Sequence, residues 1–325
     1  MGLFTGWFKK KGIARTRTAI ALGGGGIRGA AHLGVLKYLE EKEYNRFDSI
    51  VGTSAGAIFG ALYLLSRDSN EAIDKLVQTL DKLDKKKSLI NITSKKSNFL
   101  SNLKEKLYLA KSLFSMSIID ESYLEEFLVT LIGEGSTFSQ LKKPLYVVAT
   151  DLISGKDVVF SQGDLIPALM ASSAIPGAFP PQKYKNYCLI DGGSTQRLPS
   201  KIALMLGANR VMGIDVGSPF QPKENFSSSI QVISRSETIT SFILNQQNRL
   251  AVDLLLSPKF KDMKWYDFHR HQEALQAGMA EARRKKEEID RFFQSQQTRR
   301  REGLYLIKES FILDGISPDG SHRSD

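Results

Sequence analysis

The chain has 325 residues, 42% of them apolar, which suffices for one large α/β domain with appendages or for two small domains. Its net charge of +10 favours anionic partners such as phospholipid surfaces, nucleic acid or acyl phosphates, with a solvated basic surface as the alternative. The single cysteine, Cys188, excludes an internal disulfide framework and indicates a reducing, cytoplasmic setting. Its apolar neighbours predict a buried core position. No run of about 20 apolar residues predicts a membrane span.

Residues 1–17 combine four large apolar side chains with five basic residues and no acidic one. This composition is typical of a segment that makes peripheral contact with an anionic membrane, with aromatic rings at the headgroups and lysines on anionic lipid. A basic tail without a partner has the same composition. The two alternatives stay open at this point.

A short buried strand over residues 18–22 leads into a glycine-rich turn, and a helix with a broad apolar face follows from Ala30. Such a turn presents bare backbone N–H groups to an anion, and Gly24, Gly25 and Gly26 are the candidates. Arg28 either steadies the turn or attracts an anionic substrate. The turn also satisfies G-x-G-x-x-G, but the second strand ends in a hydroxyl rather than in the carboxylate that a dinucleotide-binding fold needs.

That second strand, residues 49–51, runs into Gly-Thr-Ser-Ala-Gly at residues 52–56, and an apolar helix follows over residues 57–66. Strand, tight turn and helix form the context of a nucleophile elbow, in which the flanking glycines allow a sharp turn that exposes the Ser54 hydroxyl. An ordinary turn that contains serine is the alternative. In a parallel sheet the glycine turn and Ser54 would share one edge, which would place an oxyanion hole beside a nucleophile.

Further elements are predicted as far as residue 173. Asp151 ends a central strand and is expected to cap the turn that follows it. An apolar segment over residues 107–116 suits a lid or membrane-facing helix, or else a buried helix. The predicted helices cover residues 70–83, 99–113, 121–132 and 164–173, and the strands cover residues 144–151 and 156–160 as a hairpin.

A rigid apolar loop at residues 175–181 precedes a strand at residues 189–190, which runs into Asp191 and two glycines. Asp191 is the best-placed candidate base, although an Asp-Gly turn is the commoner meaning of this pattern. Helices are predicted at residues 201–206, 231–256 and 269–295, strands at 210–216 and 263–268, a loop at 217–230 and a loosely held tail at 296–325. The alternation predicts an α/β fold with a mostly parallel sheet and helices on both faces.

A serine hydroxyl needs a group that takes its proton, usually a histidine held by a carboxylate. The chain contains only four histidines, and none lies on a predicted strand-end loop. His32 falls inside the first apolar helix, where a packed core position is expected. Asp191 acting directly on Ser54 therefore fits better than a Ser-His-Asp triad. No cluster shows metal-ligand spacing, so no metal is expected.

With these residues the chain resembles the patatin-like phospholipase family, and in particular bacterial members similar to the catalytic domain of neuropathy target esterase. Five motifs in family order, spread over residues 18–216, carry the resemblance. They are Gly-Gly-Gly-Ile-Arg-Gly at 24–29, Gly-Thr-Ser-Ala-Gly at 52–56, Ala-Thr-Asp-Leu at 149–152, Ala-Ser-Ser-Ala-Ile-Pro at 171–176 and Asp-Gly-Gly at 191–193. Gln196 and Arg197 depart from the asparagine that such proteins often carry before the proline, and this departure concerns substrate preference.

The resemblance implies a three-layer patatin-like fold and a dyad of Ser54 as nucleophile and Asp191 as base. It implies an oxyanion hole from the glycine loop, no cofactor, and hydrolysis of phospholipid or lysophospholipid esters. We expect a catalytic core at residues 18–216, a helical part packed on it at 217–295, a cytoplasmic location with peripheral membrane contact, and no nucleic-acid partner. Acyl-thioester hydrolysis or acyl transfer by the same dyad, and a lipid-binding regulatory protein with negligible activity, remain alternatives.

Overall fold

The computed structural model describes residues 17–44, 46–93, 120–294 and 311–314. The expectations for residues 1–16, for the helix at 99–113, for the lid alternative at 107–116 and for most of the tail at 296–325 lie outside these ranges. Within them, no helix is long and apolar enough to cross a membrane.

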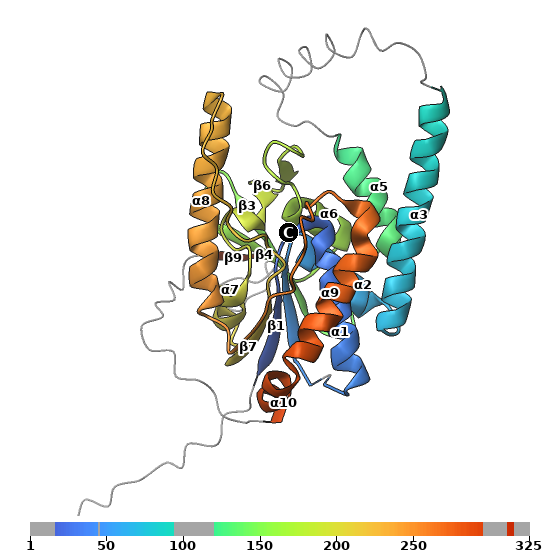
Figure 1. Ribbon diagram of the computed structural model, residues 1–325, viewed down its shortest axis with the longest axis vertical. Helices are drawn as coiled ribbons and strands as arrows, with labels where there is room; N and C mark the ends of the chain where they lie inside the picture. Colours follow the sequence, from blue (N-terminus) through green and yellow to red (C-terminus); the bar gives the residue numbers. More distant parts are fainter. Residues whose placement is uncertain (1–16, 45, 94–119, 295–310, 315–325) are drawn as a thin grey trace, which may run out of the picture.

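The described strands form one mixed, mostly parallel sheet (Figure 1). Its order is β5-β6-β3-β2-β1-β7-β8, and β4 pairs with β3 and β9 beside this path. The pairs among β1, β2, β3, β7 and β8 are parallel, whereas β6 is antiparallel to β3 and to β5. The strands are β1 (Thr18–Leu22), β2 (Ser49–Thr53), β3 (Leu145–Asp151), β4 (Asp157–Phe160), β5 (Gln182–Tyr184), β6 (Tyr187–Asp191), β7 (Arg210–Ile214), β8 (Leu254–Leu256) and β9 (Phe311–Asp314).

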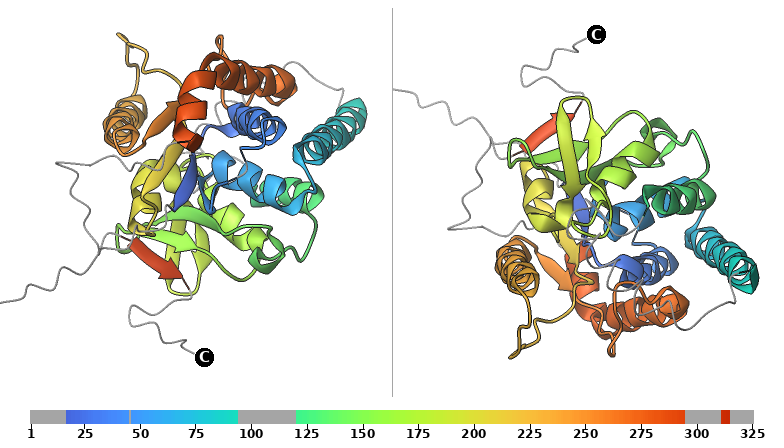
Figure 2. Two further views of the ribbon diagram at one scale, coloured as in Figure 1. Left: turned by 90° about the horizontal axis from the view of Figure 1, so that it is seen from below. Right: turned by 90° about the horizontal axis from the view of Figure 1, so that it is seen from above.

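Helices cover both faces of the sheet, as the sequence predicts (Figures 1 and 2). The side chains of β1 show why its residues are apolar throughout: Ile20 and Leu22 pack into the core on one face, and Ala19 and Ala21 pack into the core on the other. One face carries α1 (Ala30–Glu41), α2 (Ala55–Leu65), α3 (Ser69–Thr93), α5 (Glu121–Ile132), α6 (Leu165–Ser172) and α9 (His271–Arg284), and the other carries α7 (Ser200–Met205) and α8 (Ser229–Arg249).

Four predictions for the carboxy-terminal part are wrong. Within the tail expected to be loosely held, residues 311–314 form β9, which pairs in parallel with β4. The helix expected over 231–256 ends with α8 at Arg249, and residues 254–256 form β8, because a parallel partner, β7, completes their hydrogen bonding. Residues 263–268 form no strand; their first side chain, Met263, joins the core from a loop. The long helix expected over 269–295 is divided at Lys285 into α9 and α10 (Lys286–Gln294).

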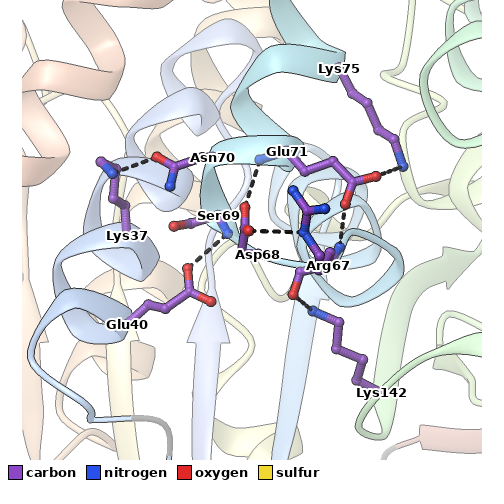
Figure 3. Close-up of polar contacts among 9 residues, drawn as sticks. All are labelled: Lys37, Glu40, Arg67, Asp68, Ser69, Asn70, Glu71, Lys75 and Lys142. Carbon is purple, nitrogen blue, oxygen red and sulfur yellow. Dashed lines mark hydrogen bonds and ion pairs between the residues drawn. The ribbon is translucent and has the colours of Figure 1, made fainter.

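A network of side chains sets the start of α3 (Figure 3). Asp68 accepts the Glu71 amide at 2.9 Å, and the Glu71 carboxylate accepts the Arg67 amide at 2.6 Å. Glu40 of α1 accepts the Ser69 amide at 2.8 Å, which ties α3 to its neighbour. The bonds to the Ser69 and Glu71 amides satisfy groups that the first turn of a helix leaves without intrahelical partners, and the bond to the Arg67 amide fixes the residue before the cap.

The α9 helix packs tightly against α1, and this contact joins the carboxy-terminal part to the core. A Cβ atom on Gly278 would lie only 2.0 Å from the Ala31 carbonyl oxygen, so the two backbones can approach this closely only with glycine there. The close approach lets Ala274 and Ala282 of α9 enter the main core.

Replacement of Gly278 by alanine should therefore destabilise the protein, by about 1–3 kcal/mol, because the added methyl forces the helix backbones apart. Thermal or urea unfolding of the full chain measures the loss. Gln276→Ala, an exposed change on the same helix, is the matched control and should leave the unfolding midpoint unchanged. Equal midpoints for the Gly278→Ala variant and the parent would contradict the close packing.

Candidate active site

Ser54 lies in the turn between β2 and α2 with backbone angles φ 53° and ψ −123°. This left-handed φ costs a residue with a side chain about 1–3 kcal/mol, so the surroundings must enforce it. The flanking glycines are sterically required: a Cβ on Gly56 would lie 2.1 Å from the Leu22 carbonyl oxygen, and one on Gly52 would lie 2.6 Å from the Ala57 amide nitrogen. The turn is thus the sharp elbow that the sequence predicts.

A second serine, Ser172 at the end of α6, holds this turn in place. Its hydroxyl accepts the Ser54 amide at 2.8 Å and donates to the Val148 carbonyl of β3 at 2.6 Å. Ser172 is fully buried, so water does not compete for these bonds. Ser172 lies in the Ala-Ser-Ser-Ala-Ile-Pro motif, but the sequence does not indicate this role because the partner is 118 residues away.

Asp191 ends β6 and is brought to Ser54 by the antiparallel pairing of β6 with β3. Its carboxylate accepts the Gly193 amide at 2.7 Å, and the Ser54 hydroxyl is near enough to lower the pKa of the carboxyl. The Asp191 amide donates to the Ala174 carbonyl at 2.9 Å, which sets the end of the strand. The structure therefore brings together the two side chains that the sequence singled out as nucleophile and base.

The environment of Asp191 weakens its acidity. Burial raises the pKa of the carboxyl to about 6, and the hydrogen bonds from Ser54 and Gly193 and the charge of Arg197 oppose this rise. A carboxylate with this pKa is a stronger base than an exposed one and is still mostly ionised at neutral pH.

The glycine turn after β1 lies beside the elbow, since a Cβ on Gly24 would lie 3.3 Å from the Ser54 Cβ. Not all of its amides are available to a ligand. The Gly24 amide donates to the Arg197 carbonyl at 2.9 Å, and the Ile27 amide donates to the Trp265 carbonyl at 2.9 Å. The Gly25 and Gly26 amides have no backbone acceptor among the described residues. These two amides therefore remain able to donate to a ligand.

Arg28 and His32 support the glycine turn from behind. The Arg28 Nε donates to the Gly25 carbonyl at 3.2 Å, and the His32 Nε2 lies 2.8 Å from the Gly23 carbonyl oxygen. Burial, with the nearby Arg197 charge, lowers the pKa of Arg28 to about 10, and burial lowers the pKa of His32 to about 4. The expectation that His32 is a packed residue holds, and its neutral imidazole donates to the turn.

Residues 195–197 connect the Asp191 loop to the other two turns. The Gln196 carbonyl accepts the Thr53 hydroxyl at 2.7 Å, and the Gln196 amide group donates to buried Asp157 at 2.9 Å. Asp157 also accepts the Thr195 hydroxyl. Nothing in the sequence separates Asp157 from an ordinary strand residue, so sequence reasoning missed it.

Other candidates have structural roles. Asp151 caps its turn as expected, because its carboxylate accepts the Ser154 amide at 3.0 Å and the Cys188 amide at 2.9 Å. Cys188 is half-buried rather than a core residue. Among the described residues, no group of three or more His, Cys, Asp or Glu side chains could hold a metal ion.

Comparison with known proteins connects this geometry to a family. The profile of the family described as patatin-like phospholipase matches residues 20–204. An uncharacterized NTE family protein of Mycobacterium tuberculosis is 31% identical over 206 residues, which cover 63% of this chain and 50% of that protein. Patatin-like phospholipase domain-containing protein 6 of Homo sapiens is 32% identical over 202 residues, which cover 62% of this chain and 13% of that protein. The chain thus matches half or less of each relative's length.

Two solved structures are also similar. VipD from Legionella pneumophila has a TM-score of 0.41 at 13% identity, with 86% of this chain and 66% of that chain covered. The ExoU–SpcU complex of Pseudomonas aeruginosa has a TM-score of 0.38 at 19% identity, with 86% and 52% covered.

Asp191 should make the free energy of unfolding depend on pH, and the Asp191→Asn variant should lack this contribution. Because burial raises its pKa to about 6, the folded protein holds a proton that the unfolded chain releases near pH 4, so the parent loses stability as pH rises through this window. The advantage of Asp191→Asn over the parent should grow by about 2 kcal/mol between about pH 4 and about pH 7. Urea unfolding of both proteins across this range measures it, and a difference that stays constant with pH would contradict the raised pKa.

Proposed function

The chain belongs to the patatin-like phospholipase family, and from this premise we propose that it is a serine hydrolase that cleaves carboxylic ester bonds of phospholipids or lysophospholipids. The observation that carries the proposal is the placement of Ser54 beside the buried Asp191 carboxylate, at an elbow whose backbone is held in a left-handed conformation. The similarity to patatin-like phospholipase domain-containing protein 6 supports the same class of substrate.

In the proposed reaction, Asp191 takes the Ser54 proton while the serine oxygen attacks the ester carbonyl. The Gly25 and Gly26 amides hold the resulting oxyanion, and the loss of one such donor typically reduces turnover about 10²–10³-fold. The tetrahedral intermediate collapses, and the departing alkoxide takes the proton from Asp191. Water then attacks the acyl-Ser54 ester with Asp191 again as base, which releases the fatty acid and restores the serine.

The surroundings of Asp191 favour direct proton transfer without a histidine. His32 is buried against the glycine turn, and His271 lies near the Phe268 carbonyl, so neither is bonded to Ser54. A carboxylate whose pKa is raised to about 6 has its basicity closer to neutral pH, where general base catalysis is efficient.

Ser54→Ala and Asp191→Asn should each abolish hydrolysis of p-nitrophenyl esters and of lysophospholipid, because one removes the nucleophile and the other its base. Circular dichroism checks that the fold persists, and a fluorophosphonate probe should label the parent but not Ser54→Ala. Ser173→Ala is the matched control, since Ser173 is buried next to the site and its hydroxyl has no described partner. Full activity of Asp191→Asn would refute the dyad, and an unlabelled parent would favour a binding protein. Faster turnover of acyl-CoA than of phospholipid would favour thioester chemistry.

The activity of the parent should fall as pH decreases through about 6, because Asp191 must be ionised to accept the serine proton. Rates of p-nitrophenyl ester hydrolysis at a subsaturating concentration measure this profile. In Arg197→Gln the inflection should move to higher pH, since the Arg197 charge lowers the pKa of Asp191. Asp151→Asn changes a carboxylate away from the dyad and should leave the inflection in place. An inflection that is unaffected by the Arg197 charge would contradict the assignment to Asp191.

A further inference from the structure

The α8 helix carries polar residues on the side that faces the protein and apolar residues on the side that faces solvent. Toward the protein it presents polar groups: the Ser241 hydroxyl donates to the Gly193 carbonyl at 3.1 Å, and the Asn245 amide donates to Asp215 at 3.0 Å. Its opposite side carries apolar residues, with Val232 53%, Ile239 39% and Ile243 52% exposed. Separations of seven and four residues place these three on one side of the helix. A helix packed only for stability would bury this side.

The loop that precedes α8 extends the apolar surface. Phe220 is 36% exposed and Phe226 is 42% exposed. The Arg235 guanidinium lies 4.1 Å from the centre of the Phe220 ring, and the Lys223 ammonium lies 5.3 Å from that of Phe226. Aromatic rings paired with cations are typical of surfaces that meet lipid headgroups and acyl chains together.

The helix that carries this surface contacts the candidate active site through its other side. Ser241 bonds to Gly193, which in turn donates its amide to Asp191. Residues 229–240 precede that contact and span roughly 18 Å of helix. In Figure 1 the upper end of α8 extends past the end of the sheet, and β1 and β2 run parallel toward the edge where Ser54 lies.

A second exposed apolar pair lies at the same edge. Leu152 is 54% exposed and Ile153 is 71% exposed, in the turn that follows β3. Because β3 runs parallel to β2, this turn and Ser54 are at the same edge of the sheet. Apolar side chains are therefore exposed at two places around the edge that carries the dyad.

We propose that the outer side of α8, with Phe220 and Phe226, docks the protein on a lipid bilayer and turns the Ser54 edge toward it. A bilayer is favoured over a second copy of the chain because the net charge of +10 attracts anionic lipid and repels a like molecule. The reason for docking at this edge rests on the proposed function, because a lipid hydrolase must take its substrate from a membrane.

The test measures vesicle binding in the catalytically silent Ser54→Ala background, so that it does not depend on activity. The full chain and a variant with Val232→Gln, Ile239→Gln and Ile243→Gln are sedimented with vesicles of equimolar phosphatidylcholine and phosphatidylglycerol. Loss of three inserted aliphatic side chains should weaken binding at least about tenfold. Ser234→Gln with Thr238→Gln, exposed polar changes on the same helix, is the control and should bind as the parent does.

In the active background, the same triple variant should hydrolyse vesicle phospholipid at least about tenfold more slowly and a soluble p-nitrophenyl ester at the parental rate. Equal vesicle binding by parent and triple variant would overturn the docking surface. So would a parent that is a dimer and a triple variant that is a monomer, if both bind vesicles equally. If the triple variant misfolds by circular dichroism, Ile243→Ser, at 52% exposure on the same side of α8, replaces it under the same criteria. An inactive parent whose vesicle binding still depends on α8 would refute the proposed function and leave the docking surface standing.

Discussion

The left-handed backbone of Ser54 is the constraint on which the rest of the site depends. A conformation that costs about 1–3 kcal/mol persists only where several contacts enforce it. The Ser172 hydroxyl supplies one, between the Ser54 amide and the Val148 carbonyl of β3. The absence of side chains at Gly52 and Gly56 supplies the other, because it lets α2 start directly above β1 and β2. Since these contacts come from three strands and two helices, the elbow exists only when β1, β2 and β3 are assembled with α2 and α6.

Burial, as much as ion pairing, sets the pKa values of the ionisable groups near the elbow. Arg28 is held close to Arg197, and the opposing attraction comes from Asp215, which also accepts the Asn245 amide and lies 3.4 Å from the Arg249 Nε. Desolvation raises the pKa of Asp191, whereas the nearby Arg197 charge lowers it. The balance leaves a carboxylate that is basic enough to take a proton and still ionised at neutral pH.

The carboxy-terminal part of the chain supports the core and also carries an exposed apolar surface that does not pack into the core. The α9 helix packs backbone to backbone against α1, whereas α8 is attached through polar contacts at Gly193 and Asp215. Apolar residues on the outer side of α8 add little to folding stability, because they stay in contact with water. The proposed docking on a lipid bilayer would give these exposed residues a role that the requirements of the fold do not supply.

The local features were determined by the sequence alone: the buried strands β1, β2 and β3, the elbow at Ser54, and the choice of Asp191 over four poorly placed histidines. These rest on short-range patterns, since glycine spacing and apolar runs act within a few residues. The tertiary structure decided which groups are free to act. It showed that the Gly24 amide is taken by the Arg197 carbonyl, and that Ser172 and Asp157 hold the turns in place. It also made residues 254–256 a strand, because they pair with β7. Such partners come from other parts of the chain, so they are defined only once the chain has folded.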